Sequence, residues 1–248
     1  MIILSIFFFI TAILYSSVGF GGGSTYLALL LIWEIPYYIF PVIALVCNII
    51  VVTGNSINYV RAGNHNFRLI IPFLIGSIPL AFFGGTLTIN KETFEILLFM
   101  VLLCAGLLLL INNKSYLDKN MIIKKINLFV SILIGSVLGL ISGIVGIGGG
   151  IFLSPILFLL KADKPKNIVT TASLFILINS ISGILGQLTK KIVLIEILFY
   201  WQLFFAVLIG GFIGNYLNLK ILTNRILAII TSLLVIFVAI RMFLKIYF

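Results

Sequence analysis

Two glycine runs are the residues of this sequence best suited to binding a ligand. Residues 18–23 read VGFGGG, and residues 145–150 repeat the pattern as VGIGGG, 127 positions later. Each glycine in a helix interior costs about 1 kcal/mol relative to alanine, so an ordinary span gains nothing from such a run. Glycine permits left-handed backbone and lets a ligand approach the main chain. A helix that begins directly after each run would present free N–H groups to an anion.

Neutral polar side chains lie near both runs and could complete such a site. Ser24 and Thr25 follow the first run, and Ser173 lies in a later apolar segment. Asn48 and Asn55 are seven residues apart and therefore share one face of a helix. For any single residue of this kind the simpler role is hydrogen bonding to a neighbouring helix. Their concentration in two corresponding segments favours a ligand path.

The sequence predicts neither an enzyme nor a metal or cofactor site. One histidine and two separated cysteines supply no metal cluster and no nucleophile–base pair. No Lys-Ser/Thr pair follows either glycine run, which excludes a Walker phosphate loop. The six acidic residues fall near the ends of apolar segments. A mid-membrane acid that would relay protons is therefore missing.

Helix packing is the simpler interpretation of the glycines. Small residues spaced four apart let membrane helices approach closely. Gly135, Gly139 and Gly143 have this spacing, and we assign them to packing. Three consecutive glycines do not follow it, so the two runs are better explained as breaks in a helix.

The elements that position these residues are predicted to be membrane helices. Of the 248 residues, 62% are apolar and 9% are charged, whereas soluble domains carry roughly 25% charged residues. The net charge of +10 lies mostly in short connections between apolar runs, the pattern of the positive-inside rule. We therefore expect a multi-pass protein of the cytoplasmic membrane whose surroundings are the lipid bilayer, and no nucleic-acid partner.

The apolar segments divide into two similar halves, which predicts an all-α polytopic membrane protein built from two repeats of about four hydrophobic segments each. The segments are 2–33, 36–60, 67–89, 93–111, 127–160, 167–189, 193–218 and 224–246. Residues 1–111 form the first predicted repeat, 112–126 a basic linker and 127–248 the second repeat. In each half a glycine run interrupts the first segment.

Two topologies are open for the interrupted segments. If each crosses the membrane once, the two halves are parallel, and the Lys and Arg residues divide 10 to 6 between the two sides. If each is a re-entrant hairpin that turns at the glycines, the halves are inverted, and the division is 11 to 5. The positive-inside rule favours the hairpins by one residue.

Several strings resemble the signature of a known family. Residues 140–150 read LISGIVGIGGG, with Ser-Pro at 154–155, and residues 17–24 form a similar string in the first half. TTAS at 170–173 and RAGNHNF at 61–67 resemble the family's helix start and basic loop. The chain thus resembles the TauE/SafE family, also called TSUP, of bacterial and archaeal permeases associated with sulfite and organosulfur anions.

The resemblance covers the full length, with one departure. Ala28 stands where the second half has Pro155, so the first break is framed differently. Membership of this family implies a transport function and leaves the substrate, the direction of transport and the oligomeric state open.

We predict a permease that moves a small anion, sulfite or an organosulfur anion, by alternating access, with a proton or counter-ion as the coupling partner. The site should lie where the two breaks meet near the membrane midplane. The predicted site residues are Gly19, Gly21, Gly22, Gly23, Ser24, Thr25, Asn48, Gly146, Gly148, Gly149, Gly150, Ile151 and Ser173. The alternatives are an uncoupled anion channel and a non-transporting membrane subunit.

Overall fold

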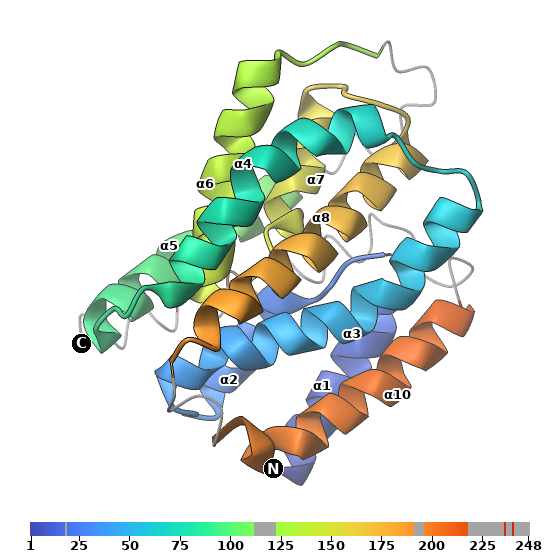
Figure 1. The fold of residues 1–248 in the computed structure, drawn as a ribbon. Helices are drawn as coiled ribbons and strands as arrows, with labels where there is room; N and C mark the ends of the chain where they lie inside the picture. The colour runs from blue at the N-terminus through green and yellow to red at the C-terminus, as the bar shows by residue number, and fades with distance from the viewer. Residues whose placement is uncertain (18, 112–122, 191–195, 218–235, 237–239, 241–248) are drawn as a thin grey trace.

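The computed structural model describes residues 1–17, 19–111, 123–190, 196–217, 236 and 240, and these residues form helices and no strand (Figure 1). The helices are α1 Ile2–Ser16, α2 Gly23–Ile32, the 3-10 helix η1 Tyr37–Ile39, α3 Phe40–Arg61, α4 Phe67–Thr86, α5 Lys91–Ile111, α6 Leu128–Val145, α7 Gly150–Leu159, α8 Pro165–Gln187, the 3-10 helix η3 Ile197–Tyr200 and α10 Trp201–Leu217. The predicted all-helical fold is confirmed. The predicted segment 224–246 and most of the predicted linker lie outside the described residues.

Helix starts follow local sequence signals. Asn66 caps α4 by accepting a hydrogen bond from the Leu69 amide, and Asn127 caps α6 in the same way. Pro41 and Pro165 lie in the first turns of α3 and α8, where the missing N–H group of proline costs nothing.

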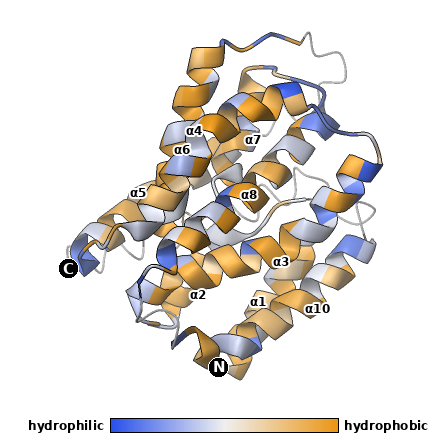
Figure 2. Cartoon of the chain, viewed as in Figure 1, coloured by the Kyte–Doolittle hydropathy of each residue, from blue (hydrophilic) through white to orange (hydrophobic). Residues whose placement is uncertain are grey.

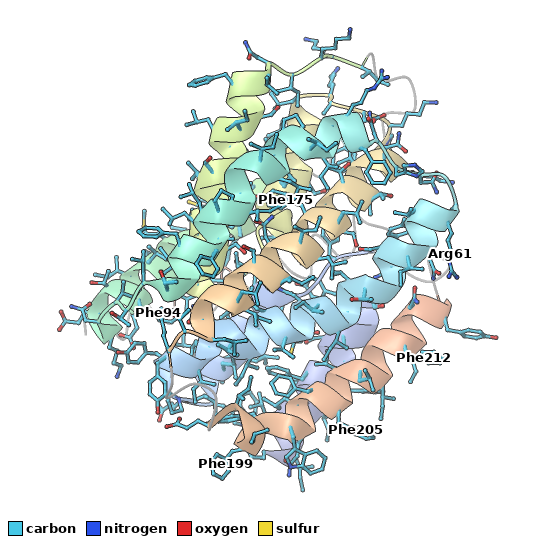
Figure 3. All side chains as sticks on the ribbon, viewed as in Figure 1. Arg61, Phe94, Phe175, Phe199, Phe205 and Phe212 are labelled. Atoms are coloured by element: carbon cyan, nitrogen blue, oxygen red, sulfur yellow. The ribbon has the colours of Figure 1, made fainter. Side chains whose placement is uncertain are left out.

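Five helices are long and apolar enough to cross a membrane: Tyr37–Arg61, Phe67–Thr86, Leu128–Val145, Pro165–Gln187 and Ile197–Tyr216. Apolar residues cover the outside of the bundle as well as its interior (Figure 2). Phe205 and Phe212 of α10, for example, point away from the bundle and are 57% and 76% exposed (Figure 3). Apolar side chains on the outside suit a lipid environment, and the chain is a multi-pass membrane protein.

The two interrupted segments both turn back on themselves. The ring of Phe7, early in α1, contacts that of Trp33, directly after α2, at a tilted angle and with ring centroids 5.5 Å apart. In the second half, the Lys124 amide before α6 donates to the Lys161 carbonyl after α7, at 3.0 Å. Each segment therefore leaves the bundle near the place where it entered, which favours the hairpin alternative.

Hydrogen bonds between connections support the same topology. The Asn66 amide, between α3 and α4, donates to the carboxylate of Asp163, between α7 and α8, at 2.7 Å. At the other end, the Lys190 ammonium after α8 donates to the Leu87 carbonyl after α4, at 2.6 Å. The crossing alternative would place the two members of each pair on opposite sides of the membrane.

Helix α6 lies along α4 through its small residues. A Cβ atom on Gly139 would collide with the Ser77 carbonyl, and one on Gly143 would collide with the Ala81 carbonyl. Gly135 contacts α4 in the same way, so the assignment of these three glycines to packing is confirmed. Because the residue numbers rise together along the contact, α4 and α6 run in the same direction.

The packing of α1 on α10 repeats that of α6 on α4. Gly214 of α10 contacts the Ile13 carbonyl of α1, and Gly84 of α4 contacts the Leu140 carbonyl of α6. Gly84 and Gly214 are 130 residues apart, and Ile13 and Leu140 are 127 apart. The first helix of each half is thus held by the other half through equivalent contacts.

The two central helices, α3 and α8, cross in opposite directions (Figure 1). The Ser56 and Ser173 hydroxyls are 3.0 Å apart, and Leu45 packs against Gly183, so the residue numbers run oppositely along the contact. Corresponding helices of the two halves are therefore antiparallel, as expected if one half is inverted relative to the other. The duplication and its domain boundaries stay predictions.

Candidate functional site

Both glycine runs contain a left-handed glycine that caps a helix. Gly22 caps α2 with φ 83°, and Gly149 caps α7 with φ 74°, both in the left-handed region that favours glycine. The Thr25 and Tyr26 amides donate to the Gly22 carbonyl at 3.0 Å, and α7 makes the same two bonds to Gly149 at 3.1 Å. The first two amides of each helix have no main-chain acceptor within the described residues.

Asn48 of α3 lies between the two turns. A Cβ atom on Gly23, in the first break, would be 2.8 Å from Asn48 Nδ2, and one on Gly148, in the second, would be 2.7 Å from it. A Cβ atom on Gly21 would meet Asn48 Oδ1. One buried side chain therefore contacts both breaks, and the glycines leave it the space to do so.

The Asn48 amide has no hydrogen-bond partner among the described residues, at either Nδ2 or Oδ1, although its exposed fraction is 0%. A buried polar group without a partner costs about 1–3 kcal/mol, and native structures contain few of them. An amide held in this way between two helix N-termini can bind the polar atoms of a ligand.

Helix α8 forms the opposite wall. Ile176 Cγ2 lies 3.1 Å from the Cβ position of Gly21 and 3.0 Å from that of Gly148. Ser180 Oγ lies 3.3 Å from the same position of Gly148 and has no partner in the described chain. Phe175, labelled in Figure 3, packs against Gly149. The centre of the site is thus formed by Asn48 on one side and Ile176 on the other.

Other unpartnered buried polar atoms occur in the helices around the breaks. Within the described chain they include Ser24 Oγ, Asn55 Oδ1, Tyr59 OH, Ser142 Oγ, Ser154 Oγ and Asn179 Oδ1. Serine hydroxyls can donate to an anion without carrying charge.

Two predicted side chains have protein partners instead. The Thr25 hydroxyl is 2.7 Å from the Tyr15 hydroxyl, a contact that joins α1 to α2 near the turn. The Ser173 hydroxyl pairs with Ser56 across the α3–α8 crossing. Both side chains fasten helices, as the simpler role predicts.

Gly19 and Gly146 lie at the far side of each turn, away from Asn48. Both have φ 87°. A Cβ atom on Gly19 would be 2.6 Å from the Tyr59 hydroxyl, and one on Gly146 would be 2.6 Å from the Pro41 carbonyl. The structure therefore brings together Gly21, Gly23, Asn48, Gly148 and Gly150, with the free amides of Ser24 and Ile151 in the first turns behind them.

Asn179 and Ser180 are among the polar residues of segment 167–189 that fit an anion path by sequence, but they were not selected for the site. A signal was present: Asn-Ser-Ile at 55–57 recurs at 179–181, at corresponding places in α3 and α8. An internal alignment of these two helices would have found the pair.

Charged side chains keep to the ends of the bundle. The end formed by the α3–α4 and α7–α8 connections, here called the basic end, carries Arg61, Arg68, Lys161, Lys164 and Lys166. The opposite end, here called the acidic end, carries Glu34, Glu92, Glu95 and Glu196. Lys190 also lies at the acidic end, and its partial burial lowers the pKa of its ammonium group below the ordinary lysine value.

Asp163 is the one charged side chain that is buried among the described residues, and it lies away from the site. Its carboxylate accepts hydrogen bonds from the side chains of Asn66 and Asn167 and from the Lys164 amide. The ten residues of α7 separate it from the second break, a helix length of about 15 Å.

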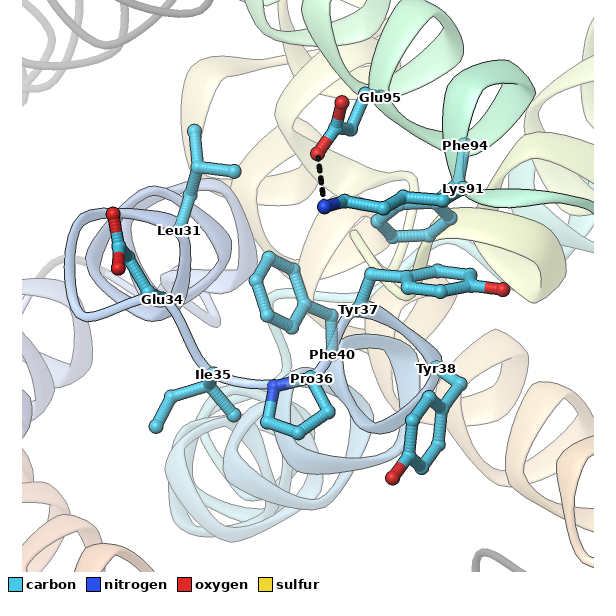
Figure 4. Close-up of a pocket in the computed structure, with 10 residues that line it drawn as sticks. All are labelled: Leu31, Glu34, Ile35, Pro36, Tyr37, Tyr38, Phe40, Lys91, Phe94 and Glu95. Carbon is cyan, nitrogen blue, oxygen red and sulfur yellow. Dashed lines mark ion pairs between the residues drawn. The ribbon is translucent and has the colours of Figure 1, made fainter.

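Two cavities lie outside the glycine site. One, of about 360 Å³, is at the acidic end and is lined by Glu34, Tyr37, Tyr38 and the ion pair of Lys91 with Glu95 (Figure 4). An apolar groove of about 410 Å³ lies between α3 and α10. Neither includes a predicted site residue, and the glycine site itself is buried.

The fold defines a multi-pass helical membrane protein whose polar centre is formed by two helix N-termini. The chain matches the family model described as sulfite exporter TauE/SafE over residues 4–242, and it belongs to this family.

Two curated relatives are both named as a probable membrane transporter protein. One, from Sinorhizobium fredii, is 26% identical over 235 residues, which is 93% of each chain. The other, from Methanocaldococcus jannaschii, is 32% identical over 197 residues, 74% of this chain and 70% of the relative. No solved structure matches the chain. The names of the family and of these relatives describe membrane transport and no enzymatic activity.

Proposed function

We propose that the protein is a permease that carries a small anion, sulfite or an organosulfur anion, across the cytoplasmic membrane. The observation that carries the proposal is Asn48, a buried amide without a partner in the described chain, set between the starts of α2 and α7. Helix N-termini attract anions through their free N–H groups and dipoles. The family name supports a sulfur oxyanion as the substrate.

The position of the site suits a carrier. Asn48 is about 12 Å along the 33 Å length of α3, at about 1.5 Å per residue. Ile176 is near the middle of α8. In a hydrocarbon layer of about 30 Å, both residues would lie close to the midplane, where broken helices bind substrates in transporters.

Alternating access accounts for the buried site and for the opposed halves. At the basic end, Asn66 bonds to Asp163; at the acidic end, Tyr38 bonds to Glu196, at 2.8 Å. Each bond joins the end of one hairpin to a connection of the other half. Opening one end while the other stays closed would expose Asn48 to one side at a time.

The uncoupled anion channel is the second candidate. The observation in its favour is that the buried side chains around Asn48 in the described structure include no carboxylate or histidine that could carry a coupling proton. Flux that follows the anion gradient alone and ignores an imposed pH difference would support the channel.

Replacing Asn48 by leucine tests the site. Leucine has nearly the shape of asparagine and removes two unpaired polar atoms, so Asn48→Leu should fold with equal or higher thermal stability. Its sulfite flux in proteoliposomes should be lost. Asn58→Leu is the matched control, because Asn58 lies on the same helix, is exposed, and bonds at the surface to Asn215 of α10 at 3.0 Å, away from the site. Wild-type flux in Asn48→Leu would refute the site, and absence of sulfur-anion flux in the wild type would refute the substrate class.

A further inference from the structure

We infer that the site selects a singly charged, hydrogen-bearing anion and discriminates against dianions. For a sulfur oxyanion, the transported form would be hydrogensulfite and not sulfite. The inference rests on the proposed function, since it concerns the species that the same site accepts. It follows from two observations: the charge available at the site, and the donor and acceptor groups of Asn48.

Among the described residues, the positive charge at the site comes from helix ends. Each helix N-terminus is equivalent to about +0.5 elementary charge, and the N-termini of α2 and α7 are both set against Asn48. Together they offer about one positive charge. No lysine, arginine or histidine is buried in the described part of the chain. A monoanion is therefore neutralised at this site, whereas a dianion keeps about one uncompensated charge in a medium of low polarity.

The hydrogen-bonding groups favour a ligand that carries a hydrogen. Asn48 offers one NH₂ donor and one carbonyl acceptor, whichever way the amide is turned. The Ile147 carbonyl, 2.7 Å from the Cβ position of Gly23, is a second acceptor at the same place. A fully deprotonated oxyanion can only accept, so it would meet these two acceptors unfavourably. An anion with one acidic hydrogen can accept from Asn48 Nδ2 and donate to an oxygen.

The protein itself does not change charge at the site near neutral pH. The titratable side chains of α1, α2, α3, α6, α7 and α8 within the apolar part of the bundle are Tyr15, Tyr26, Cys47 and Tyr59. All four groups are ordinarily protonated and neutral at pH 7. Lys166, Asp163 and His65, the single histidine of the sequence, lie at the basic end and outside the site. A pH dependence of the apparent substrate affinity would therefore report the substrate.

The test is the pH dependence of the KM for sulfite. Purified wild-type protein in liposomes of phosphatidylethanolamine and phosphatidylglycerol is given radiolabelled sulfite, with equal pH on both sides and oxygen excluded. Hydrogensulfite loses its proton near neutral pH. Between one pH unit below and one above that pKa, the monoanion fraction falls about tenfold. The KM for total sulfite should rise about tenfold, with the maximal rate unchanged.

Different outcomes would overturn the selection of the monoanion and the proposed transport function. A KM for total sulfite that stays constant or falls as pH rises would overturn the selection of the monoanion while leaving the transporter intact. Saturable flux absent at every pH would remove the proposed function itself. Sulfate is a dianion throughout this range. Its inhibition constant against sulfite transport should be at least about tenfold higher than the KM for hydrogensulfite. Equal competition by sulfate would also overturn the inference.

A charge variant provides an independent measurement. Asn48→Asp adds a negative charge where the dipoles compensate only about one, so sulfite flux should fall by about tenfold or more. Asn58→Asp, the same change on the exposed part of α3, should stay within about twofold of wild type. Equal flux in both variants would show that the anion does not contact Asn48.

Discussion

The two glycine breaks share left-handed glycines at their first position and at the helix cap, but they differ at Gly21 and Gly148, of which only Gly148 has a positive φ, and they are fastened at different points. The end of each hairpin at its glycine turn is here called the tip, and the opposite end, where the chain enters and leaves the bundle, is called the base. The tip of the first hairpin is held by the Tyr15–Thr25 hydroxyl pair. The corresponding positions of the second hairpin are Ser142 and Phe152, and Ser142 Oγ has no partner in the described residues. The base of the second hairpin is held by the hydrogen bonds of Asp163.

The bases of the two hairpins differ in how deeply their hydrogen bonds are buried. Asp163 is 5% exposed and accepts three hydrogen bonds at the base of the second hairpin. At the base of the first, Tyr38 makes an exposed hydrogen bond to Glu196. The comparison indicates a first hairpin that is fastened near the anion site by its own hydroxyl pair. Near the tip of the second hairpin, the Gln187 side chain of α8 donates to the Gly143 carbonyl of α6 at 2.8 Å. The first tip is thus held by a bond within the hairpin and the second by a bond from a neighbouring helix.

The largest effect is expected at the helix caps. Gly149→Leu puts a side chain on left-handed backbone and against the Phe175 ring, 2.8 Å from the Cβ position. We expect transport to be abolished with membrane insertion intact. Gly63→Leu is the control, since Gly63 has φ 72° in open space and shares the backbone strain. Comparable flux losses in both variants would attribute the effect to strain and not to the site.

Asp163→Asn should weaken the base of the second hairpin. The amide retains the shape of the carboxylate but presents an NH₂ group to donors, which costs about 1–3 kcal/mol of stability. The melting temperature in detergent should fall clearly, whereas Glu196→Gln, at the exposed base of the first hairpin, should change it little. Equal falls would contradict the difference between the two bases.

Tyr15→Phe should loosen the tip of the first hairpin. It leaves the Thr25 hydroxyl without its Tyr15 partner and should lower the unfolding free energy by about 1–2 kcal/mol. Ser142→Ala, at the corresponding place of the second hairpin, removes an unpaired hydroxyl and should be neutral or slightly stabilising. Thermal unfolding of both variants measures the asymmetry of the tips.

The smallest effect concerns Lys190, which bonds to Leu87 at the acidic end. Burial lowers the pKa of Lys190 in the folded protein, so the unfolded chain holds that proton more strongly. Stability from this residue therefore rises as pH increases toward the ordinary lysine pKa of about 10.4. The melting temperature of wild type relative to Lys190→Met should increase slightly over this range, and a decrease would contradict the assignment.

The sequence alone predicted the helices and the two breaks, because glycine runs and apolar segments are local signals. Asn48 was also selected, but only the crossing of α3 with both hairpins shows that it contacts Gly23 and Gly148 together. Thr25 and Ser173 were selected on residue type, and their hydroxyls prove to be paired within the protein. Residue type cannot distinguish a free hydroxyl from a paired one.

The choice between hairpins and crossings was also beyond the sequence. The distribution of Lys and Arg differed between the two topologies by one residue. The contact of Asn66 with Asp163 joins positions 97 apart in the chain, and no local pattern reports such a contact. Asn179 and Ser180 belong to the polar residues of segment 167–189 that fit an anion path, but they were not chosen for the site, because their recurrence with Asn55 and Ser56 requires an internal alignment.

The contact of α1 with α10 has a consequence for the biogenesis of the protein. Helix α1 is synthesised before the other described helices, whereas Gly210 and Gly214, which let α10 approach it closely, are synthesised about 200 residues later. Until then the strip of α1 around Phe9 and Ile13 has no permanent neighbour. The packing of α1 is therefore completed only after α10 has entered the membrane, and the two halves are assembled together and not one after the other.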